Sequence, residues 1–189
     1  MILASASPRR RELLGGLGLR FTVRAADLDE TPLSCETPEE TVLRLAREKA
    51  AAQAHPGEIV LAADTVVVID GELLGKPRDP EDARSMLARI AGREHTVFTG
   101  VAVEEPGRGR RVSELASSRV RMAPLTAEQI EWYVATGEPL DKAGSYAVQG
   151  IGALFVEEIF GNYTNVVGLP LPLTWKLFRE VGYELMEFR

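Results

Sequence analysis

The chain contains few of the residues that bind transition metals or form disulfides. Its 189 residues include one cysteine, Cys35, and two histidines, His55 and His95. A single cysteine excludes an internal disulfide and fits a reducing compartment. With only two histidines beside it, the chain has no credible zinc site. A metal bound here is therefore expected to be a hard ion, held by carboxylates and phosphate oxygens.

Long apolar runs and an excess of basic residues are also missing. No apolar stretch has the length of a transmembrane helix, and the first residues lack the basic and apolar regions of a signal peptide. Acidic residues outnumber basic ones by 28 to 22, for a net charge of −6. That charge argues against general binding to nucleic acid. We therefore expect a cytoplasmic protein that binds neither membranes nor nucleic acid, although a local basic pocket could still take a small phosphate ligand.

Two common nucleotide-binding signatures are absent. No Gly-x-Gly-x-x-Gly follows the first predicted strand, and no Gly-x-x-x-x-Gly-Lys-Ser/Thr occurs. The apolar patterns nevertheless predict alternating strands and helices, with hairpins between several strands, which is typical of a mixed sheet flanked by helices. Strands are predicted at residues 2–4, 21–26, 58–69, 96–103, 112–122, 145–148 and 153–160, and helices from residue 8 and at 37–54, 79–92, 126–136 and 170–181.

The first ten residues predict an anion site. Residues 2–4 suit a buried strand, Ser7 is a good N-cap and Pro8 fits the first helical position. Arg9 and Arg10 then lie in the first turn, where cations oppose the helix dipole. A solvated basic helix start is the simpler interpretation of an isolated Arg pair. Together with the serines Ser5 and Ser7, the pair favours an anion bound at the turn.

Asp64 is the most unusual residue. Apart from Glu58 at its start, the apolar strand 58–69 contains no other charged side chain. Burying a carboxylate without a partner is costly. One interpretation is a core Asp bonded to backbone or to an Arg. The other is a metal ligand or general base at a strand end.

Three further charged residues have weaker signals. Glu30 lies in an acidic stretch that by itself indicates a solvated loop. Lys49 borders the apolar face of helix 37–54, where many lysines simply extend to water. Lys76, between Gly75 and Pro77, is held at a defined position that suits contact with phosphate oxygens. We expect neither lysine to be fully buried.

The remaining polar positions divide into structural and binding candidates. His95, at a strand start, is more typical of a structural hydrogen bond than of catalysis. The segment around Asn165 is interpreted as a structural turn. Gln149 follows a run of small and polar residues that brings backbone close to a flat ligand, and its amide offers both a donor and an acceptor to a base.

Taken in order, these segments resemble the Maf family of nucleoside triphosphate pyrophosphatases. Each motif is weak alone, but the ordered set runs through nearly the whole chain and is specific. The matching pieces are Ser5-Ala-Ser-Pro-Arg-Arg10, Glu30, Ala46-Arg-Glu-Lys49, Ala63-Asp-Thr65, Gly75-Lys-Pro77, His95-Thr-Val-Phe-Thr-Gly100, Asp141-Lys-Ala-Gly144, Gln149-Gly150 and Asn165-Val-Val-Gly-Leu-Pro170.

The resemblance implies one α/β domain over residues 1–189, with an elongated mixed sheet flanked by helices, two lobes and a central cleft, like inosine triphosphate pyrophosphatases. It implies metal-dependent hydrolysis of a nucleoside triphosphate to the monophosphate and pyrophosphate by a homodimer, with Mg²⁺, or alternatively Mn²⁺ or Co²⁺. Asp64 would activate water and, with Glu30, hold the metal. The substrate phosphates would be bound by cations and hydroxyls: Arg10, Lys49, Lys76, Ser5 and Ser7.

The resemblance also implies a substrate class. Arg9, Thr65 and Gln149 match the members that favour dTTP and UTP, whereas a sister group that prefers methylated guanine nucleotides carries Trp, Gln and Glu there. The sequence leaves two alternatives. One is a pyrophosphatase for modified nucleotides such as methylated GTP. The other is a non-catalytic, nucleotide-binding regulator of septum formation, which would need the cations but not Asp64 and Glu30 together.

Overall fold

The computed structural model describes residues 1–189, and its contacts divide the chain into two compact units. Unit 1 comprises residues 1–64, 99–116 and 168–189, and unit 2 comprises residues 65–98 and 117–167. Three long strands, β3 (Val60–Ile69), β5 (Glu94–Glu105) and β6 (Arg110–Met122), contribute residues to both units. None of the helices is long and apolar enough to cross a membrane.

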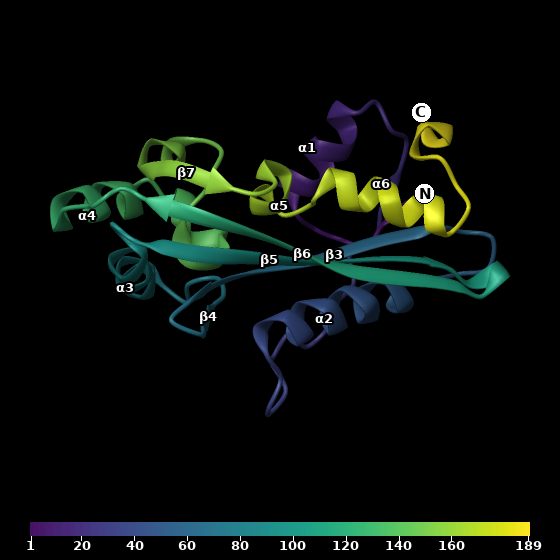
Figure 1. Ribbon diagram of the computed structural model, residues 1–189, viewed down its shortest axis with the longest axis horizontal. Coiled ribbons are helices and arrows are strands. Elements are labelled where there is room, and N and C mark those ends of the chain that lie inside the picture. The colour runs from purple at the N-terminus through teal and green to yellow at the C-terminus, as the bar shows by residue number, and fades with distance from the viewer. The chain divides into compact units, whose positions relative to one another are not determined.

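The strands form one mixed sheet in the order β2-β1-β3-β5-β6-β7, with β4 paired to β3 (Figure 1). The other strands are short: β1 (Ile2–Leu3), β2 (Thr22–Val23), β4 (Glu72–Leu74) and β7 (Val156–Phe160). β1 pairs in parallel with β2 and β3, whereas β3 with β4 and β6 with β7 are antiparallel. The predicted mixed α/β sheet is therefore confirmed.

Six α-helices flank the strands. They are α1 (Pro8–Gly16), α2 (Pro38–Ala52), α3 (Pro80–Ile90), α4 (Ala127–Ala135), α5 (Tyr163–Val167) and α6 (Leu171–Glu180). The start signals in the sequence explain where most of them begin. Capping boxes open α2 and α4, with Thr37 and Thr126 as N-caps, and Asp79 caps α3. Ser7 does precede Pro8 at the start of α1, but its hydroxyl does not cap the helix.

Two strand predictions were wrong at residues 145–148 and in the first part of 153–160. Gly144 and Ser145 have φ values of 69° and 60°, so the backbone enters the left-handed region and cannot continue as a strand. Residues 143–145 and 151–155 instead form 3₁₀ turns, and β7 begins only at Val156. Asp70 and Gly71, by contrast, both have positive φ and make a tight turn between β3 and β4, as the Asp-Gly pair in the sequence indicates.

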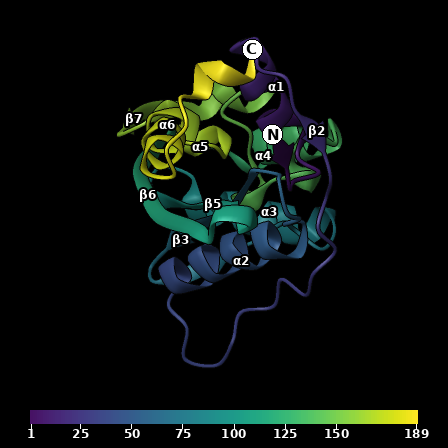
Figure 2. The ribbon, with the colours of Figure 1, turned by 90° about the vertical axis from the view of Figure 1, so that its right-hand side faces the viewer.

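Unit 1 is a three-layer arrangement in which alternate residues of β3 enter different cores. Val60 and Ala62 pack with Ala46 and Ala50 of α2, whereas Leu61 and its neighbours on the other face pack with residues of α1 and α6. The two-residue period of a strand produces this division. Figures 1 and 2 show α2 on one face of these strands and α6 on the other.

Gly100 on β5 has no side chain, and this allows α2 to pack closely against the sheet. A Cβ atom there would lie 2.4 Å from the carbonyl oxygen of Val42 in α2. Gly100→Ala is therefore expected to push α2 from the sheet and to lower the free energy of unfolding by roughly 1–3 kcal/mol. Urea denaturation measures the change.

The matched control is Gly16→Ala in α1, where the added carbon would meet no atom within 4 Å beyond its chain neighbours and the helix's own backbone. Alanine also favours the helix, so this variant should be as stable as the parent or slightly more stable. Equal stability of the Gly100 and Gly16 variants would contradict the proposed packing constraint.

Unit 2 has its own core, which includes a buried histidine. His95 begins β5, is 3% exposed, and its Nε2 lies 2.8 Å from the Tyr146 hydroxyl. Its Nδ1 is buried without a hydrogen-bond partner. The interpretation of His95 as a strand-start residue with a structural hydrogen bond is confirmed. Burial lowers the pKa of His95 to about 4.

This depressed pKa predicts a loss of stability in mild acid. Between about pH 6.5 and pH 4 the unfolded chain binds a proton at His95 that the folded chain excludes, so stability falls as pH falls through that window. Between pH 7.5 and pH 5 the contribution is roughly 2 kcal/mol. Urea unfolding at both pH values should show a smaller drop for His95→Gln than for the parent; an equal drop would contradict the assignment.

Candidate functional site

The centre of the site is a buried ion pair between β3 and α2. Asp64 lies two residues beyond Ala62 on β3, so it faces α2. Lys49 lies beside Ala46 and Ala50, on the side of α2 that packs on the sheet. Its Nζ donates to Oδ1 of Asp64 at 2.6 Å, and the side chains of Lys49 and Asp64 are 9% and 10% exposed.

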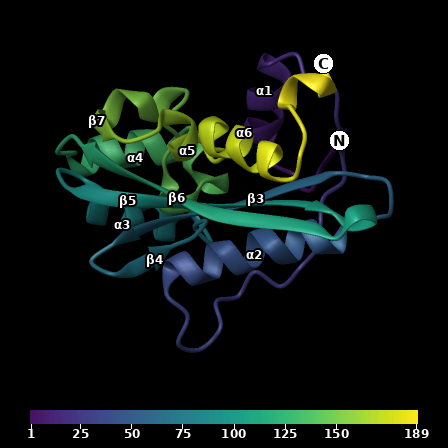
Figure 3. The same ribbon diagram turned by 45° about the vertical axis from the view of Figure 1, so that its right-hand side comes forward.

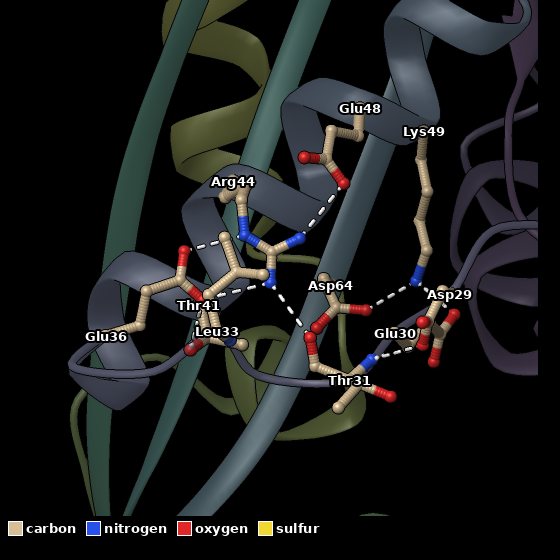
Figure 4. A network of polar contacts seen from close by, with 10 residues as sticks. All are labelled: Asp29, Glu30, Thr31, Leu33, Glu36, Thr41, Arg44, Glu48, Lys49 and Asp64. Atoms are coloured by element: carbon tan, nitrogen blue, oxygen red, sulfur yellow. Dashed lines mark hydrogen bonds and ion pairs between the residues drawn. The ribbon is translucent and has the colours of Figure 1, made fainter.

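Glu30 brings a second carboxylate to the same lysine. Its Oε1 lies 2.6 Å from Nζ of Lys49, but its side chain is 55% exposed. Glu30 comes from the segment at residues 24–37, which joins β2 to α2 without regular structure. Figure 4 shows Lys49 extending from α2 toward Asp64 on one side and Glu30 on the other. The site thus contains one buried carboxylate, that of Asp64, and one at the surface, that of Glu30.

Arg10 anchors the N-terminal turn in the same unit. Its Nη1 donates to the Ser5 hydroxyl at 2.9 Å and its Nε to the Gly168 carbonyl at 2.7 Å. Burial lowers the pKa of Arg10, while the nearby charges of Asp64 and Glu30 act in the opposite direction. The predicted basic turn therefore lies in the electrostatic field of the two carboxylates. Arg9, on the same turn, is partly exposed.

The position of Lys49 corrects one expectation. The sequence predicted a lysine that borders the apolar face and is not fully buried, but Lys49 is 7% exposed. The ion pair with Asp64 explains how the charge is accommodated in the layer between α2 and the sheet. Lys76, by contrast, is exposed as expected.

Thr65, Lys76 and Gln149 belong to unit 2. Thr65 directly follows Asp64 in β3. The amide of Gly144 donates to the carbonyl of Gly75 at 3.0 Å, which joins the turn that carries Lys76 to the segment that leads to Gln149. The prediction that these three residues join Asp64 and Lys49 in one pocket stays a prediction.

Glu138, which no motif in the sequence singles out, shapes the segment beside Gln149. Glu138 accepts hydrogen bonds from the amides of Ile151 and Gly152 and from the Tyr133 hydroxyl, at 2.7–2.9 Å. Burial raises the pKa of Glu138, but these hydrogen bonds outweigh it and hold the pKa below its usual value. No local pattern in the sequence distinguished Glu138 from a solvated residue.

The donor set fits a hard divalent cation. Oxygens of Glu30 and Asp64 each lie 2.6 Å from one ammonium group, so two carboxylates already converge on a positive charge. Ions such as Mg²⁺ are commonly bound by one or two carboxylates together with substrate phosphates. No group of three or more His, Cys, Asp and Glu side chains that could hold a metal ion is found.

The fold and site define an α/β protein with a carboxylate and cation cluster beside a basic helix start. The sequence profile of the Maf family, described as Maf-like protein, matches residues 1–181. The chain belongs to the Maf family, as its ordered motifs predicted.

Three curated relatives, each called dTTP/UTP pyrophosphatase, are similar over nearly the whole chain. The protein of Anaeromyxobacter dehalogenans (strain 2CP-C) is 55% identical over 98% of this chain and 95% of its own length. That of Myxococcus xanthus (strain DK1622) is 53% identical over 98% and 94%. That of Symbiobacterium thermophilum is 50% identical over 98% and 95%.

Among solved structures, the Ham1 protein of Staphylococcus aureus is similar with a TM-score of 0.42 and 15% identity, over 65% of this chain and 71% of that one.

Because Lys49 belongs to a buried ion pair, replacing it should lower stability more than replacing an exposed lysine. Lys49→Met removes the cation and leaves Asp64 buried without its partner, so the free energy of unfolding should fall by roughly 3–5 kcal/mol. Lys76→Met, at an exposed position, is the control and should change stability by less than about 0.5 kcal/mol. Similar urea midpoints for the two variants would show that the pair contributes nothing to the fold.

Proposed function

We propose that this protein hydrolyses dTTP and UTP to the monophosphate and pyrophosphate. The observation that carries the proposal is the convergence of Asp64 and Glu30 on Lys49, 2.6 Å from each, in a chain that is 50–55% identical to proteins called dTTP/UTP pyrophosphatases. Cleavage between the α- and β-phosphates needs a directed water molecule and compensation of the charge on the leaving pyrophosphate. The site offers groups suited to both tasks.

Asp64 is proposed as the general base. It is held on a central strand and its Oδ1 is fixed by Lys49, so the other carboxylate oxygen can accept the proton of the attacking water. Glu30 and Asp64 together would hold a divalent metal, most simply Mg²⁺, with Mn²⁺ or Co²⁺ as other candidates. When bound, such an ion neutralises phosphate charge and polarises the phosphoryl oxygen.

The triphosphate is proposed to be bound by the basic helix start and the lysines. Arg10, Lys49 and Lys76 supply positive charge, and Ser5 and Ser7 supply hydroxyl donors. The Ser7 hydroxyl makes no capping hydrogen bond to α1. Amide groups at a helix N-terminus favour an anion beside them. Charge-assisted hydrogen bonds of this kind are the strong ones in phosphate recognition.

Arg9, Thr65 and Gln149 are proposed to select the base. The Gln149 amide can pair with both the N3–H and a carbonyl of uracil or thymine, and a base with another pattern would leave buried polar groups unpaired. We further propose that residues 1–189 act as one catalytic domain, in the cytoplasm and as a homodimer. A purely regulatory nucleotide-binding role would not require the pair of carboxylates.

The test is pyrophosphate release from dTTP, UTP, CTP, GTP and methylated GTP, each with and without Mg²⁺. dTTP and UTP should be hydrolysed fastest, and only with the metal. Faster hydrolysis of methylated GTP than of both pyrimidine nucleotides would contradict the substrate class, and no release from any nucleotide would favour the regulatory alternative.

Asp64→Asn keeps the shape of the side chain but removes the base. Turnover of dTTP should fall by roughly 10²–10⁴-fold in a protein that remains folded. Asp27→Asn, the same substitution at an exposed loop position, is the matched control and should keep the parent's turnover. A folded Asp64→Asn variant with turnover close to that of the Asp27 control would remove Asp64 from the mechanism.

A further inference from the structure

Glu30 reaches the site from a segment that has no helix or strand to hold it. Residues 24–37 leave β2 and pass to the far side of α2 before that helix begins (Figures 2 and 3). The start of the segment is fixed by Arg24, which pairs with Glu58 at 2.8 Å. The end is fixed by the capping box of Thr37. Glu30 lies between these anchors. Its carboxylate pairs with Lys49, and contacts to its backbone neighbours constrain it further.

Arg44 supplies a constraint on the middle of the segment. It projects from α2, five residues before Lys49, and its Nη2 donates to the carbonyl of Thr31 at 3.2 Å. Thr31 is the residue after Glu30, so this hydrogen bond holds the backbone beside the carboxylate. The amide of Thr31 in turn donates to Oδ1 of Asp29 at 2.9 Å, which closes a tight turn around Glu30.

The same guanidinium is locked by Glu36. Nε of Arg44 lies 2.6 Å from Oε1 and Nη2 lies 3.0 Å from Oε2, a two-point pairing with side chains that are 19% and 16% exposed. Hydrogen bonding from Arg44 lowers the pKa of Glu36 to about 2, so the pair stays ionised at neutral pH. Glu36 also accepts from the amide of Leu33 at 3.0 Å. Figure 4 shows Arg44 at the centre of these contacts, beside Lys49, Asp64 and Glu30.

We propose that Arg44 is a positioning residue for Glu30: with Glu36 it clamps residues 29–36 to α2 and thereby sets the affinity of the Glu30 and Asp64 carboxylates for a divalent cation. The proposal rests on the proposed function for the identity of the metal site. Arg44 and Lys49 stand on one rigid helix, so the clamp fixes Glu30 relative to the lysine that both carboxylates share. Loss of the clamp leaves Asp64 in place on β3 and loosens the segment that carries Glu30.

The experiment compares Arg44→Gln with Arg47→Gln. Arg47 lies on the same helix and donates to the Ser113 hydroxyl at 2.6 Å, away from residues 24–37, so it is a matched control for the chemical change. Two quantities are measured for each variant and the parent. One is the affinity for Mn²⁺ alone, by calorimetric titration. The other is the Mg²⁺ concentration that gives half-maximal hydrolysis of dTTP.

Arg44→Gln should weaken Mn²⁺ binding and raise the half-maximal Mg²⁺ concentration by about tenfold or more, as is typical when a residue that orients a metal ligand is removed. Turnover at saturating Mg²⁺ should change by less than about threefold, because Asp64 stays on β3. Arg44→Lys keeps the charge but cannot make the two-point pairing, so it should behave like Arg44→Gln. Arg47→Gln should match the parent in both quantities.

A folded Arg44→Gln variant with the parent's Mn²⁺ affinity and Mg²⁺ dependence overturns the proposal, and so does a parent protein that binds no Mn²⁺. If Arg44→Gln does not fold, Glu36→Gln tests the clamp from its other side and must show the same shift. The Mn²⁺ titration decides the clamp even if the parent releases no pyrophosphate from dTTP or UTP, an outcome that would refute only the proposed function.

Discussion

The buried ion pair between Lys49 and Asp64 is the interaction on which unit 1 and its site depend. Two charges taken out of water in the layer between α2 and β3 are tolerated only when they meet in good geometry, and their 2.6 Å contact meets that condition. The pair therefore links stability to function. The same groups that let α2 close on the sheet are the groups proposed to act on the substrate.

Two simple periods bring these residues together. The two-residue period of β3 places Asp64 on the face that Val60 and Ala62 present to α2, and the helical period places Lys49 beside Ala46 and Ala50. Small residues on both elements bring the backbones close, and Gly100 on β5 leaves room for the backbone of Val42. A larger side chain at these positions would separate the lysine from the aspartate without touching either.

Much of this could be predicted from the sequence, because the signals are local. The capping boxes, the Asp70-Gly71 turn and the apolar strands are properties of neighbouring residues, and the ordered motifs identified the family. The burial of Lys49 was not predictable in the same way, since a lysine at the edge of an apolar face is typical of an exposed residue until its partner is known. The wrong strand at 145–148 has a similar cause: its left-handed residues include Ser145, which has no local signal for that conformation.

The two carboxylates of the site are held by different means. Asp64 is fixed by a central strand with the core on both sides, so its position can change only if the fold changes. Glu30 is half-exposed and is positioned by its ion pair with Lys49 and by the contacts of Arg44 and Glu36 to the segment that carries it. These contacts lie at the edge of α2 and contribute little apolar burial. A site built in this way can vary its proposed affinity for a cation through the segment at residues 24–37, while Asp64, the proposed general base, and the fold stay unchanged.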